Sequence, residues 1–351
     1  MTEPTSKPAR LKDVARHAGL AAPTVSRFLN GAITLPEDTV KRINAAITAL
    51  NYRPNPHARS LSLGRSDTIG LALPDIANPF FSRFAAATEA VSLDRGRSVI
   101  LSSTLNRIDG EAKSFDRLSH GVFDGLLFAT NRADDGALAR LVNDNAARVV
   151  LVDEDIPGTR VPKVFSDNDQ GGALAGEVLV EAGHRDFAYI GGPENLMSTI
   201  ERGAGFARAV AAAGPGARIH MVAHGEHDAD HGRQAMHRLL DEAPEVTALF
   251  TGSDAIFMGA LEVMRARGLR PGREISVVTF DDMAPLDFMD PPITAIRHPI
   301  HALADAAVGL LCDRLTAPPA PGDDSEPACL KLPVALMRRA SVGPPPGRTG
   351  R

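Results

Sequence analysis

The stretch LKDVARHAGLAAPTVSRFLNG, residues 11–31, is typical of two short helices joined by a glycine turn. Gly19 ends the first apolar face, as a residue that tolerates left-handed backbone should, and Val25 begins the second. A third helix is expected over residues 37–50, behind Pro36. Three short helices in this order predict a helix-turn-helix, which places its second helix in the major groove of DNA.

The second helix has an unusual start. Ala21 stands at the N-cap position and offers no side-chain acceptor, which costs about 1 kcal/mol relative to a polar cap. Pro23 suits the first helical turn, yet it disfavours helical backbone at Ala22. The helix is therefore expected to start one residue late. Ala22 and Pro23 can offer DNA only apolar contact, for example to a thymine methyl group.

Polar residues that can contact DNA follow directly. Thr24 and Ser26 are short and suit contacts with phosphates or base edges. Arg27 could bond a guanine through both arms of its guanidinium or hold a phosphate, and the residue type leaves both readings open. Asn30 is expected to contact the DNA backbone or to cap the helix end.

The charge of the chain is unevenly distributed. Residues 1–65 contain ten basic and four acidic side chains, so this part carries +6 and the remainder −11, against a total of −5. A basic head on an acidic body indicates that the head alone meets a polyanion. An uneven surface that is merely solvated is the alternative interpretation.

A different pattern begins at Thr68. Short apolar runs alternate with helical stretches, as in parallel sheets that helices cover on both faces. Right-handed crossovers then give doubly wound sheets, and the length of the region favours two similar subdomains over one sheet. The expected strands are 69–74, 98–103, 125–130, 148–153, 163–167, 187–192, 248–252 and 275–282.

Several function classes lack their sequence signatures. No G-x-G-x-x-G follows the first strand, and neither a G-x-x-x-x-G-K-[ST] phosphate loop nor a G-x-S-x-G nucleophile motif occurs. Cys312 and Cys329 form neither a disulfide framework nor a metal-ligand set. The sequence shows no secretory signal and no apolar run long enough to span a membrane. A cytoplasmic location is therefore expected.

Histidines gather in the segment HMVAHGEHDADHGRQAMH, residues 220–237. His227 and His231 are four residues apart, as in some zinc-binding helices. Gly225 and Gly232 instead favour a loop followed by a helix, with Asp230 as a suitable N-cap. A surface loop or pocket lip is therefore favoured over a metal site, and neither a metal nor a cofactor is expected.

The chain contains a series of motifs in a fixed order: LKDVARHAGL, TVSRFLNG, LNYRPNPHARSL, TIGLALPDIANPFF, SDNDQGG, GHRDFAYIGGP, ERGAGF, VVTFDDM and PPITAIRHP. In this order they resemble the lactose-repressor/galactose-repressor (LacI/GalR) family of bacterial transcription regulators, over about residues 10–340. The resemblance implies an all-α helix-turn-helix domain at 10–53 and a hinge helix or linker at 54–66. It also implies an effector-binding and dimerisation domain at 67–342, with two subdomains like periplasmic binding proteins, and a disordered tail at 343–351.

The resemblance implies a homodimer that binds double-stranded, pseudo-palindromic operator DNA and is not an enzyme. Leu61 matches the leucine with which the family's hinge helices open the central base step in the minor groove. Packing of Leu61 against the partner hinge is the alternative. The residues implied to contact DNA are Leu11, Ala22, Pro23, Thr24, Ser26, Arg27, Asn30, Thr34, Asn55, Ala58 and Leu61.

The body is implied to hold a small effector in a cleft between its subdomains. Asp153 and Asp281 each close a strand, and ligands of open α/β sheets lie at the carboxyl ends of strands. Arg202 can donate a fork of hydrogen bonds to a sugar, or form an interdomain salt bridge. The residues implied to contact the effector are Asn78, Phe80, Phe81, Asp153, Ser198, Arg202, His227, Ser253, Asp281 and Arg297, and at least one phenylalanine is expected to be core instead.

The acidity of this pocket indicates the kind of effector. Glu154 stands next to Asp153, and with Asp281 these carboxylates favour a neutral polyhydroxyl compound over a phosphorylated one. Arg202 and Arg297 would also suit a sugar acid. The predicted function is that of a nucleoid-associated, operator-binding repressor controlled by a small sugar or sugar derivative. A solute-binding protein for transport, a body with enzymatic activity and a non-sugar effector are the alternatives.

Overall fold

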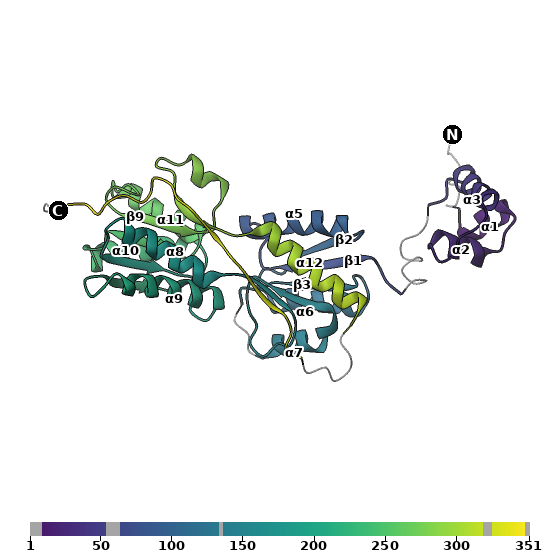
Figure 1. Cartoon of the computed structure of the whole chain (residues 1–351), viewed down its shortest axis with the longest axis horizontal. Helices are drawn as coiled ribbons and strands as arrows, with labels where there is room; N and C mark the ends of the chain where they lie inside the picture. Colours follow the sequence, from purple (N-terminus) through teal and green to yellow (C-terminus); the bar gives the residue numbers. More distant parts are fainter. Residues whose placement is uncertain (1–8, 54–63, 133–135, 319–324, 348–351) are drawn as a thin grey trace. The chain divides into compact units, whose positions relative to one another are not determined.

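The computed structural model describes residues 9–53, 64–132, 136–318 and 325–347. It divides into a head, residues 1–68 with 121–124, and a body that comprises the rest of the chain. Figure 1 labels their helices and strands. None of the helices in the described ranges is long and apolar enough to cross a membrane.

The head is a three-helix unit, as predicted. Its helices are α1 (Leu11–Ala18), α2 (Ala22–Leu29) and α3 (Glu37–Ala49). Gly19 ends α1 at φ 65°, and the guanidinium of Arg42 on α3 donates to the carbonyl oxygens of Ala18 and Gly19. This bond fixes the turn of the helix-turn-helix. The buried core of the head consists of Val14, Ala15, Ala18, Val25, Ile43 and Ala46.

The expected late start of α2 is wrong. The carbonyl of Ala21 already accepts from the N–H groups of Thr24 and Val25, at 3.0 and 3.3 Å. Ala21 is therefore the N-cap, without a side-chain cap, and Ala22 is the first helical residue. Pro23 fits the first turn because its missing N–H would have no partner inside the helix.

The body consists of two lobes, each built on a six-stranded sheet (Figure 1). In the first, the N-lobe, the strand order is β11-β5-β4-β3-β1-β2. These strands are β1 (Thr68–Leu73), β2 (Ser98–Ser103), β3 (Gly125–Phe128), β4 (Val149–Val152), β5 (Lys163–Ser166) and β11 (Cys329–Leu332). The helices of the N-lobe are α5 (Pro79–Asp94), α6 (Ile108–Ser119), α7 (Ala137–Asp144) and α12 (Ile300–Thr316).

The second lobe, the C-lobe, repeats this plan with strand order β12-β10-β9-β8-β6-β7. Its strands are β6 (Asp186–Ile190), β7 (Arg218–Ala223), β8 (Ala248–Thr251), β9 (Ser276–Phe280), β10 (Thr294–Arg297) and β12 (Ala335–Met337). Its helices are α8 (Asn168–Glu181), α9 (Met197–Ala212), α10 (Ala229–Glu242) and α11 (Asp254–Ala266). The recorded pairings are parallel except the antiparallel edge pair β10–β12, so the predicted doubly wound α/β body is confirmed.

The chain passes between the lobes three times: from β5 to α8, from β10 to α12, and from β11 to β12 (Figure 1).

All eight strands expected from the sequence are present, with ends that agree within a residue or two. The prediction of Asp230 as a helix cap is wrong, because α10 begins earlier and Asp228 accepts from the N–H of His231 at 2.8 Å. The start of the tail also differs from the predicted disorder, since Gly343 exchanges hydrogen bonds with Ser276.

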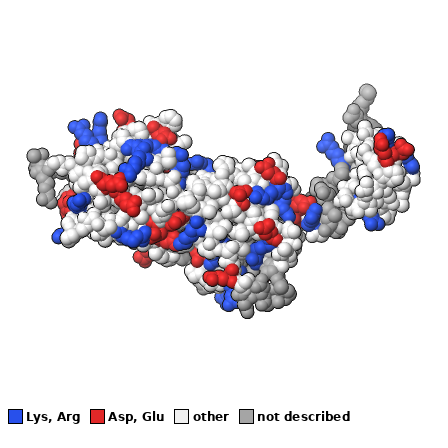
Figure 2. Space-filling model, in the orientation of Figure 1, with Lys and Arg blue, Asp and Glu red and all other residues white. Residues whose placement is uncertain are grey.

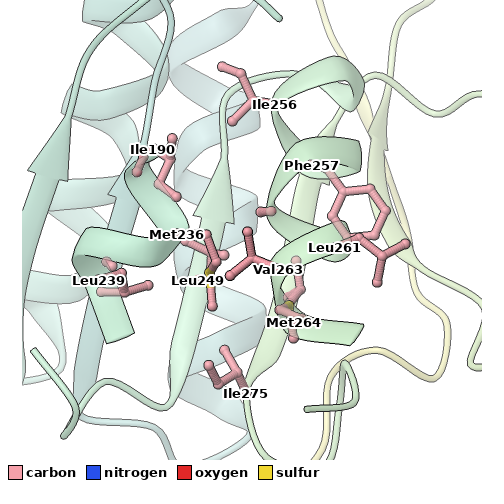
Figure 3. Close-up of a cluster of buried hydrophobic side chains, with 14 of the residues drawn as sticks. Ile190, Met236, Leu239, Leu249, Ile256, Phe257, Leu261, Val263, Met264 and Ile275 are labelled. Atoms are coloured by element: carbon pink, nitrogen blue, oxygen red, sulfur yellow. The ribbon is translucent and has the colours of Figure 1, made fainter. Parts of the chain in front are cut away.

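Apolar side chains hold each sheet to its helices. In the C-lobe, α10 and α11 pack on the sheet through Met236, Leu239 and Phe257 against Ile190 and Leu249, as Figure 3 shows. Each such side chain, when fully buried, contributes about 1.5–3 kcal/mol relative to exposure. The core makes the sheet a rigid base for the loops at its carboxyl edge.

Helices α8 and α9 approach closely because glycine faces backbone on both. A Cβ at Gly172 on α8 would overlap the carbonyl of Arg202, and a Cβ at Gly205 on α9 would overlap the carbonyl of Asp169. The pair therefore packs backbone against backbone. This packing fixes the position of Arg202, a residue predicted to face the effector.

Candidate DNA-binding head and ligand-binding cleft

Helix α2 of the head has one exposed face. Pro23, Ser26, Arg27 and Asn30 are spaced at i, i+3, i+4 and i+7, and Pro23 and Arg27 are exposed. Arg27 forms no ion pair within the described part of the chain, so its guanidinium is available to an anion or a base edge. Ala22 instead packs against the head core, so of the two apolar residues only Pro23 points outward.

The other residues predicted to contact DNA have varied positions. Leu11 is half-buried against the head core, Thr24 is half-buried on α2, and Thr34 is exposed in the loop before α3. Asn30 is the C-cap residue of α2. The predicted hinge residues Asn55, Ala58 and Leu61 lie outside the described residues.

In the body, two carboxylates project where strands end. Asp153 follows β4 at φ 72° and Asp281 follows β9 at φ 69°, so both stand in a left-handed turn that redirects the chain at the sheet edge. Burial, together with the neighbouring Glu154, raises the pKa of Asp153 to about 7. A carboxyl group of this kind can donate or accept a hydrogen bond near neutral pH.

Arg202 is buried beside these carboxylates and is held on three sides. Its Nε donates to Asn168 Oδ1 at 2.8 Å, a terminal nitrogen donates to the carbonyl of Gly252 at 2.6 Å, and its guanidinium lies 3.8 Å from the ring centre of Phe280. The predicted alternative of an interdomain salt bridge therefore does not describe its hydrogen bonds. The orientation of this buried cation is fixed before any ligand arrives.

His298 was not predicted as a site residue. Its ring lies between Asp281 of the C-lobe and Ser166 of the N-lobe. Its Nε2 lies 2.6 Å from Asp281 Oδ1, and its Nδ1 lies 2.6 Å from the hydroxyl of Ser166. Burial lowers the pKa of His298 below its usual range, so the neutral ring donates to Asp281 and accepts from Ser166. Burial alone would raise the pKa of Asp281, but the hydrogen bond from His298 helps to hold this pKa below its ordinary value.

The start of α5 forms the N-lobe wall of the cleft. Asn78 caps this helix by accepting from the N–H of Phe80 at 2.8 Å. Phe80 is half-buried and its ring centre lies 4.6 Å from that of His298, whereas Phe81 is 2% exposed and belongs to the N-lobe core. The expectation that one of the two rings is core therefore fits Phe81, whose edge still borders the cleft.

His227 lies on the C-lobe wall, opposite α5. A Cβ at Gly192 would overlap its imidazole, so the ring rests directly on backbone. Burial and the nearby charge of Arg202 lower the pKa of His227 to about 4, and its buried Nδ1 has no hydrogen-bond partner in the described structure. A neutral ring with an unsatisfied nitrogen at a cavity wall suits a ligand hydroxyl.

Two other histidines of residues 220–237 have partners of their own. His220, on the edge strand β7, lies between Asp186 and Glu245, at 2.9 and 2.8 Å. His231 lies 3.0 Å from the carbonyl of Gly191. In the described ranges no group of three potential ligands is arranged to hold a metal ion.

Ser198 and Ser253 stand at helix starts in the C-lobe. Ser253 caps α11 by accepting from the N–H of Ile256 at 3.3 Å. Ser198, near the start of α9, donates through its hydroxyl to Glu154 at 2.7 Å. Glu154 is 2% exposed and does not border the cavity, so it does not add a free charge to it as predicted.

Arg297 is not brought to the cavity. Its Nε donates to Asp282 at 2.7 Å, and it does not line any of the three cavities found in the cleft. His298, the next residue, faces the cleft in its place.

Asp254, which follows Ser253, also borders the cleft and was not predicted. Burial and the nearby Asp281 raise the pKa of Asp254 to about 7.

Two of the three cavities in the cleft share lining residues and are connected. The inner pocket, of about 30 Å³, is lined by Asn78, Phe80, Phe81, Asn131, Asp153, Ser198, Arg202, His227, Ser253, Asp281 and His298. The outer chamber, of about 450 Å³, is lined by Asp75, Ala77, Asn78, Pro79, Phe81, Asn106, Asn131, Pro193, Glu226, His227, Asp228, Asp254, Ala255, Met258 and Met283. Nine of the ten predicted effector residues therefore gather around the inner pocket.

The charged surface of the body is mixed. On the face shown in Figure 2, basic and acidic side chains of the body are interspersed rather than separated into one basic and one acidic area. Within the outer chamber the balance is different, because its described lining contains four carboxylates and neither Lys nor Arg. This lining suits hydroxyl groups better than phosphates.

Comparison with known proteins accounts for both parts of the chain. Residues 10–55 match the family model of bacterial regulatory proteins of the lacI family, and residues 66–339 match that of periplasmic binding proteins and the sugar-binding domain of the LacI family. The regulator CelR of Thermobifida fusca is 32% identical over 338 residues, covering 94% of this chain and 97% of CelR. The repressor PurR of Photorhabdus laumondii is 32% identical over 312 residues, covering 88% and 90%.

Solved structures agree with this assignment. The Lac repressor dimer bound to operator and the anti-inducer ONPF matches with a TM-score of 0.83 and 27% identity, over 96% of this chain and 100% of that one. The CelR–cellobiose complex matches with a TM-score of 0.70 and 31% identity, over 95% and 99%. With its helix-turn-helix head and two-lobed body, the chain belongs to the LacI family of bacterial regulatory proteins, and it is a DNA-binding regulator of transcription rather than an enzyme.

Proposed function

We propose that this protein is a repressor that binds a pseudo-palindromic operator as a homodimer and whose affinity for the operator is controlled by a neutral sugar in the body cleft. The observation that carries the proposal is the lining of that cleft: carboxylates, amides and the neutral His227 face a cavity of about 450 Å³. This volume is in the range of small-molecule sites, roughly 300–1,000 Å³. Acceptors arranged in this way match the hydroxyl groups of a sugar.

Two features support a neutral effector over a phosphorylated one. Glu154 already occupies the start of α9, the kind of helix end that binds phosphates in other proteins. The buried Arg202 is the basic side chain nearest the inner pocket, and it is already bonded to Asn168 and Gly252. A phosphate would therefore have to enter a site rich in carboxylates, in which two nitrogens of the buried Arg202 guanidinium are already engaged.

Relatives support control by a ligand. The solved structure of CelR is a complex with cellobiose, and that of the Lac repressor contains operator together with the anti-inducer ONPF. The residues proposed to face the effector here are Asn78, Phe80, Asp153, Arg202, His227, Asp281 and His298. Those proposed to face operator DNA on the head are Pro23, Ser26 and Arg27, with Asn55, Ala58 and Leu61 from the hinge. Because a DNA-binding regulator acts where its DNA lies, the protein is proposed to act in the cytoplasm, at the nucleoid.

The test has two steps. Selection of bound DNA from a random pool by the full chain should yield a pseudo-palindromic site. Fluorescence anisotropy with that site, during titration with neutral sugars, sugar acids and sugar phosphates, should then show that neutral sugars change operator affinity. A response to sugar phosphates alone would overturn the neutral effector. Sugar binding without selection of any DNA site would instead indicate a solute-binding protein.

A further inference from the structure

The two spaces of the cleft differ in a way that bears on the size of the ligand. The residues expected to hold a sugar surround the inner pocket, yet its volume is about 30 Å³. A cavity of about 10–15 Å³ is enough to hold one water molecule. The inner pocket therefore has room for a hydroxyl or hydroxymethyl group and not for a sugar ring.

The outer chamber has the room that the inner pocket lacks, since its volume is about 450 Å³. The two spaces are adjacent, because Asn78, Phe81, Asn131 and His227 line both. A ligand whose end group reaches the inner pocket must therefore place its rings in the outer chamber. The residues that contact those rings are mostly different from the set expected from sequence.

The outer chamber offers polar contacts from both lobes. On the N-lobe side, Asn106 Oδ1 accepts from the backbone N–H of Asn131 at 3.2 Å, which fixes the side-chain amide of Asn106 beside Asn131. On the C-lobe side, Glu226 is exposed and Asp254 is buried. Amides and carboxylates on facing walls can bond hydroxyl groups on both edges of a sugar ring.

Apolar side chains lie between these polar groups. Met258 and Met283 come from the C-lobe, and Ala77 and Pro79 come from the N-lobe. Flat apolar sides of a sugar ring can rest on such surfaces, and methionine adapts its shape to an irregular ligand. The chamber thus combines the two kinds of contact that a chain of sugar units presents along its length.

We propose that the effector is a disaccharide or a longer saccharide, with a terminal hydroxyl group in the inner pocket and at least two sugar units in the outer chamber. This inference rests on the proposed sugar control and adds the length of the ligand. Asn106, Glu226, Asp254 and Met258 form the second subsite. A single sugar unit fills only part of the chamber and leaves these residues in water.

Calorimetry on the full chain tests the proposal with three matched series: glucose, cellobiose and cellotriose; glucose, maltose and maltotriose; and xylose, xylobiose and xylotriose. In at least one series the affinity should rise tenfold or more from one unit to two, and the same disaccharide should change operator affinity. A monosaccharide that binds as tightly as its dimer overturns the second subsite but leaves sugar control intact. Binding of none of the saccharides, with a response to another metabolite, overturns both.

Substitutions in the outer chamber separate the two subsites. Glu226→Ala and Asn106→Gly, of which the second preserves the left-handed backbone at φ 53°, should each weaken disaccharide binding five- to tenfold and leave monosaccharide binding within twofold. Glu89→Ala, an exposed carboxylate on α5 away from the cleft, is the matched control and should change neither. Equal losses for both sugars in the chamber variants contradict a second subsite.

Discussion

The carboxylate of Glu154, two residues after β4 in the N-lobe, accepts hydrogen bonds from Ser198, the second residue of α9 in the C-lobe. The hydroxyl of Ser198 donates at 2.7 Å and its backbone N–H lies 3.3 Å from both carboxylate oxygens. The N-cap residue of α9, Leu196, provides no side-chain acceptor. One lobe therefore caps a helix of the other, and the bond joins the walls of the cleft.

Replacing Glu154 by Ala should destabilise the body by about 1–3 kcal/mol, because buried donors at the start of α9 lose their acceptor. Urea denaturation followed by circular dichroism measures the change. Glu89→Ala removes an exposed carboxylate and should stay within about 0.5 kcal/mol of the unsubstituted protein. Equal stability of both variants would show that water replaces the cap without cost.

Asp153 should make stability depend on pH. Burial and the neighbouring Glu154 raise its pKa from 3.8 to about 7, so the folded state binds a proton that the unfolded state releases at lower pH. The contribution of the Asp153 carboxyl group to folding stability is therefore complete below pH 3.8 and is lost as the pH rises through about 7. Asp254, whose pKa is also raised to about 7, acts in the same direction.

The variant Asp153→Asn should remove this loss. At pH 8 this variant should be more stable than the unsubstituted protein by ~2 kcal/mol. A pKa shift of one unit corresponds to about 1.4 kcal/mol, and solvent screens part of the charge. Thermal unfolding between pH 4 and pH 8 measures the slope for both proteins. Parallel curves would mean that Asp153 is ionised in the fold at neutral pH.

Gly192 should be needed for ligand binding although it offers no side chain. A Cβ at this position would overlap the imidazole of His227 and push the ring from the cleft wall. Gly192→Ala should therefore weaken effector binding about tenfold, which corresponds to about 1.4 kcal/mol. Gly216→Ala, where a Cβ meets no atom within 4 Å, is the control. Unchanged affinity in both variants would remove His227 from the site.

The strands that sequence predicts best are those buried on both faces. β3, β4, β8 and β9 are buried along their whole length and mostly apolar, because helices cover both sides of the sheet. β7 was not expected because it is an edge strand whose alternate residues, among them His220, face solvent. β11 and β12 were missed because they form only where the chain returns to pair with strands far away in sequence.

The cleft was predictable in outline for a similar reason. Asp153 and Asp281 could be placed because both directly follow apolar strands, and the carboxyl ends of parallel strands share one edge. Arg297 and His298 show the limit of this reasoning. Neighbouring residues of an extended chain point in opposite directions, so an assignment that is wrong by one residue selects Arg297, which pairs with the buried Asp282, in place of His298, which faces the cleft.

The direction of two side chains on α2 gives a test of how the head reads DNA. Pro23 is exposed on the same face as Arg27, whereas Ala22 packs against the head core. Pro23→Gln should therefore change the preferred operator half-site, while Ala22→Gln should lower head stability and leave the preference unchanged. Selection from random DNA with each variant measures the preference. A change caused by Ala22→Gln alone would mean that α2 is rotated in the groove.

The expected role of Leu61 depends on its match to the family's hinge leucine. A side chain wedged between base pairs is used only where the operator bends to admit it. Leu61→Ala should therefore weaken binding to the selected operator by tenfold or more, and weaken binding to random-sequence DNA by less than twofold. Competition binding at one fixed salt concentration compares the two, because phosphate contacts alone vary steeply with salt. Equal losses on both DNAs would assign Leu61 to packing between the hinges, since a contact within the dimer would be lost whatever the DNA sequence.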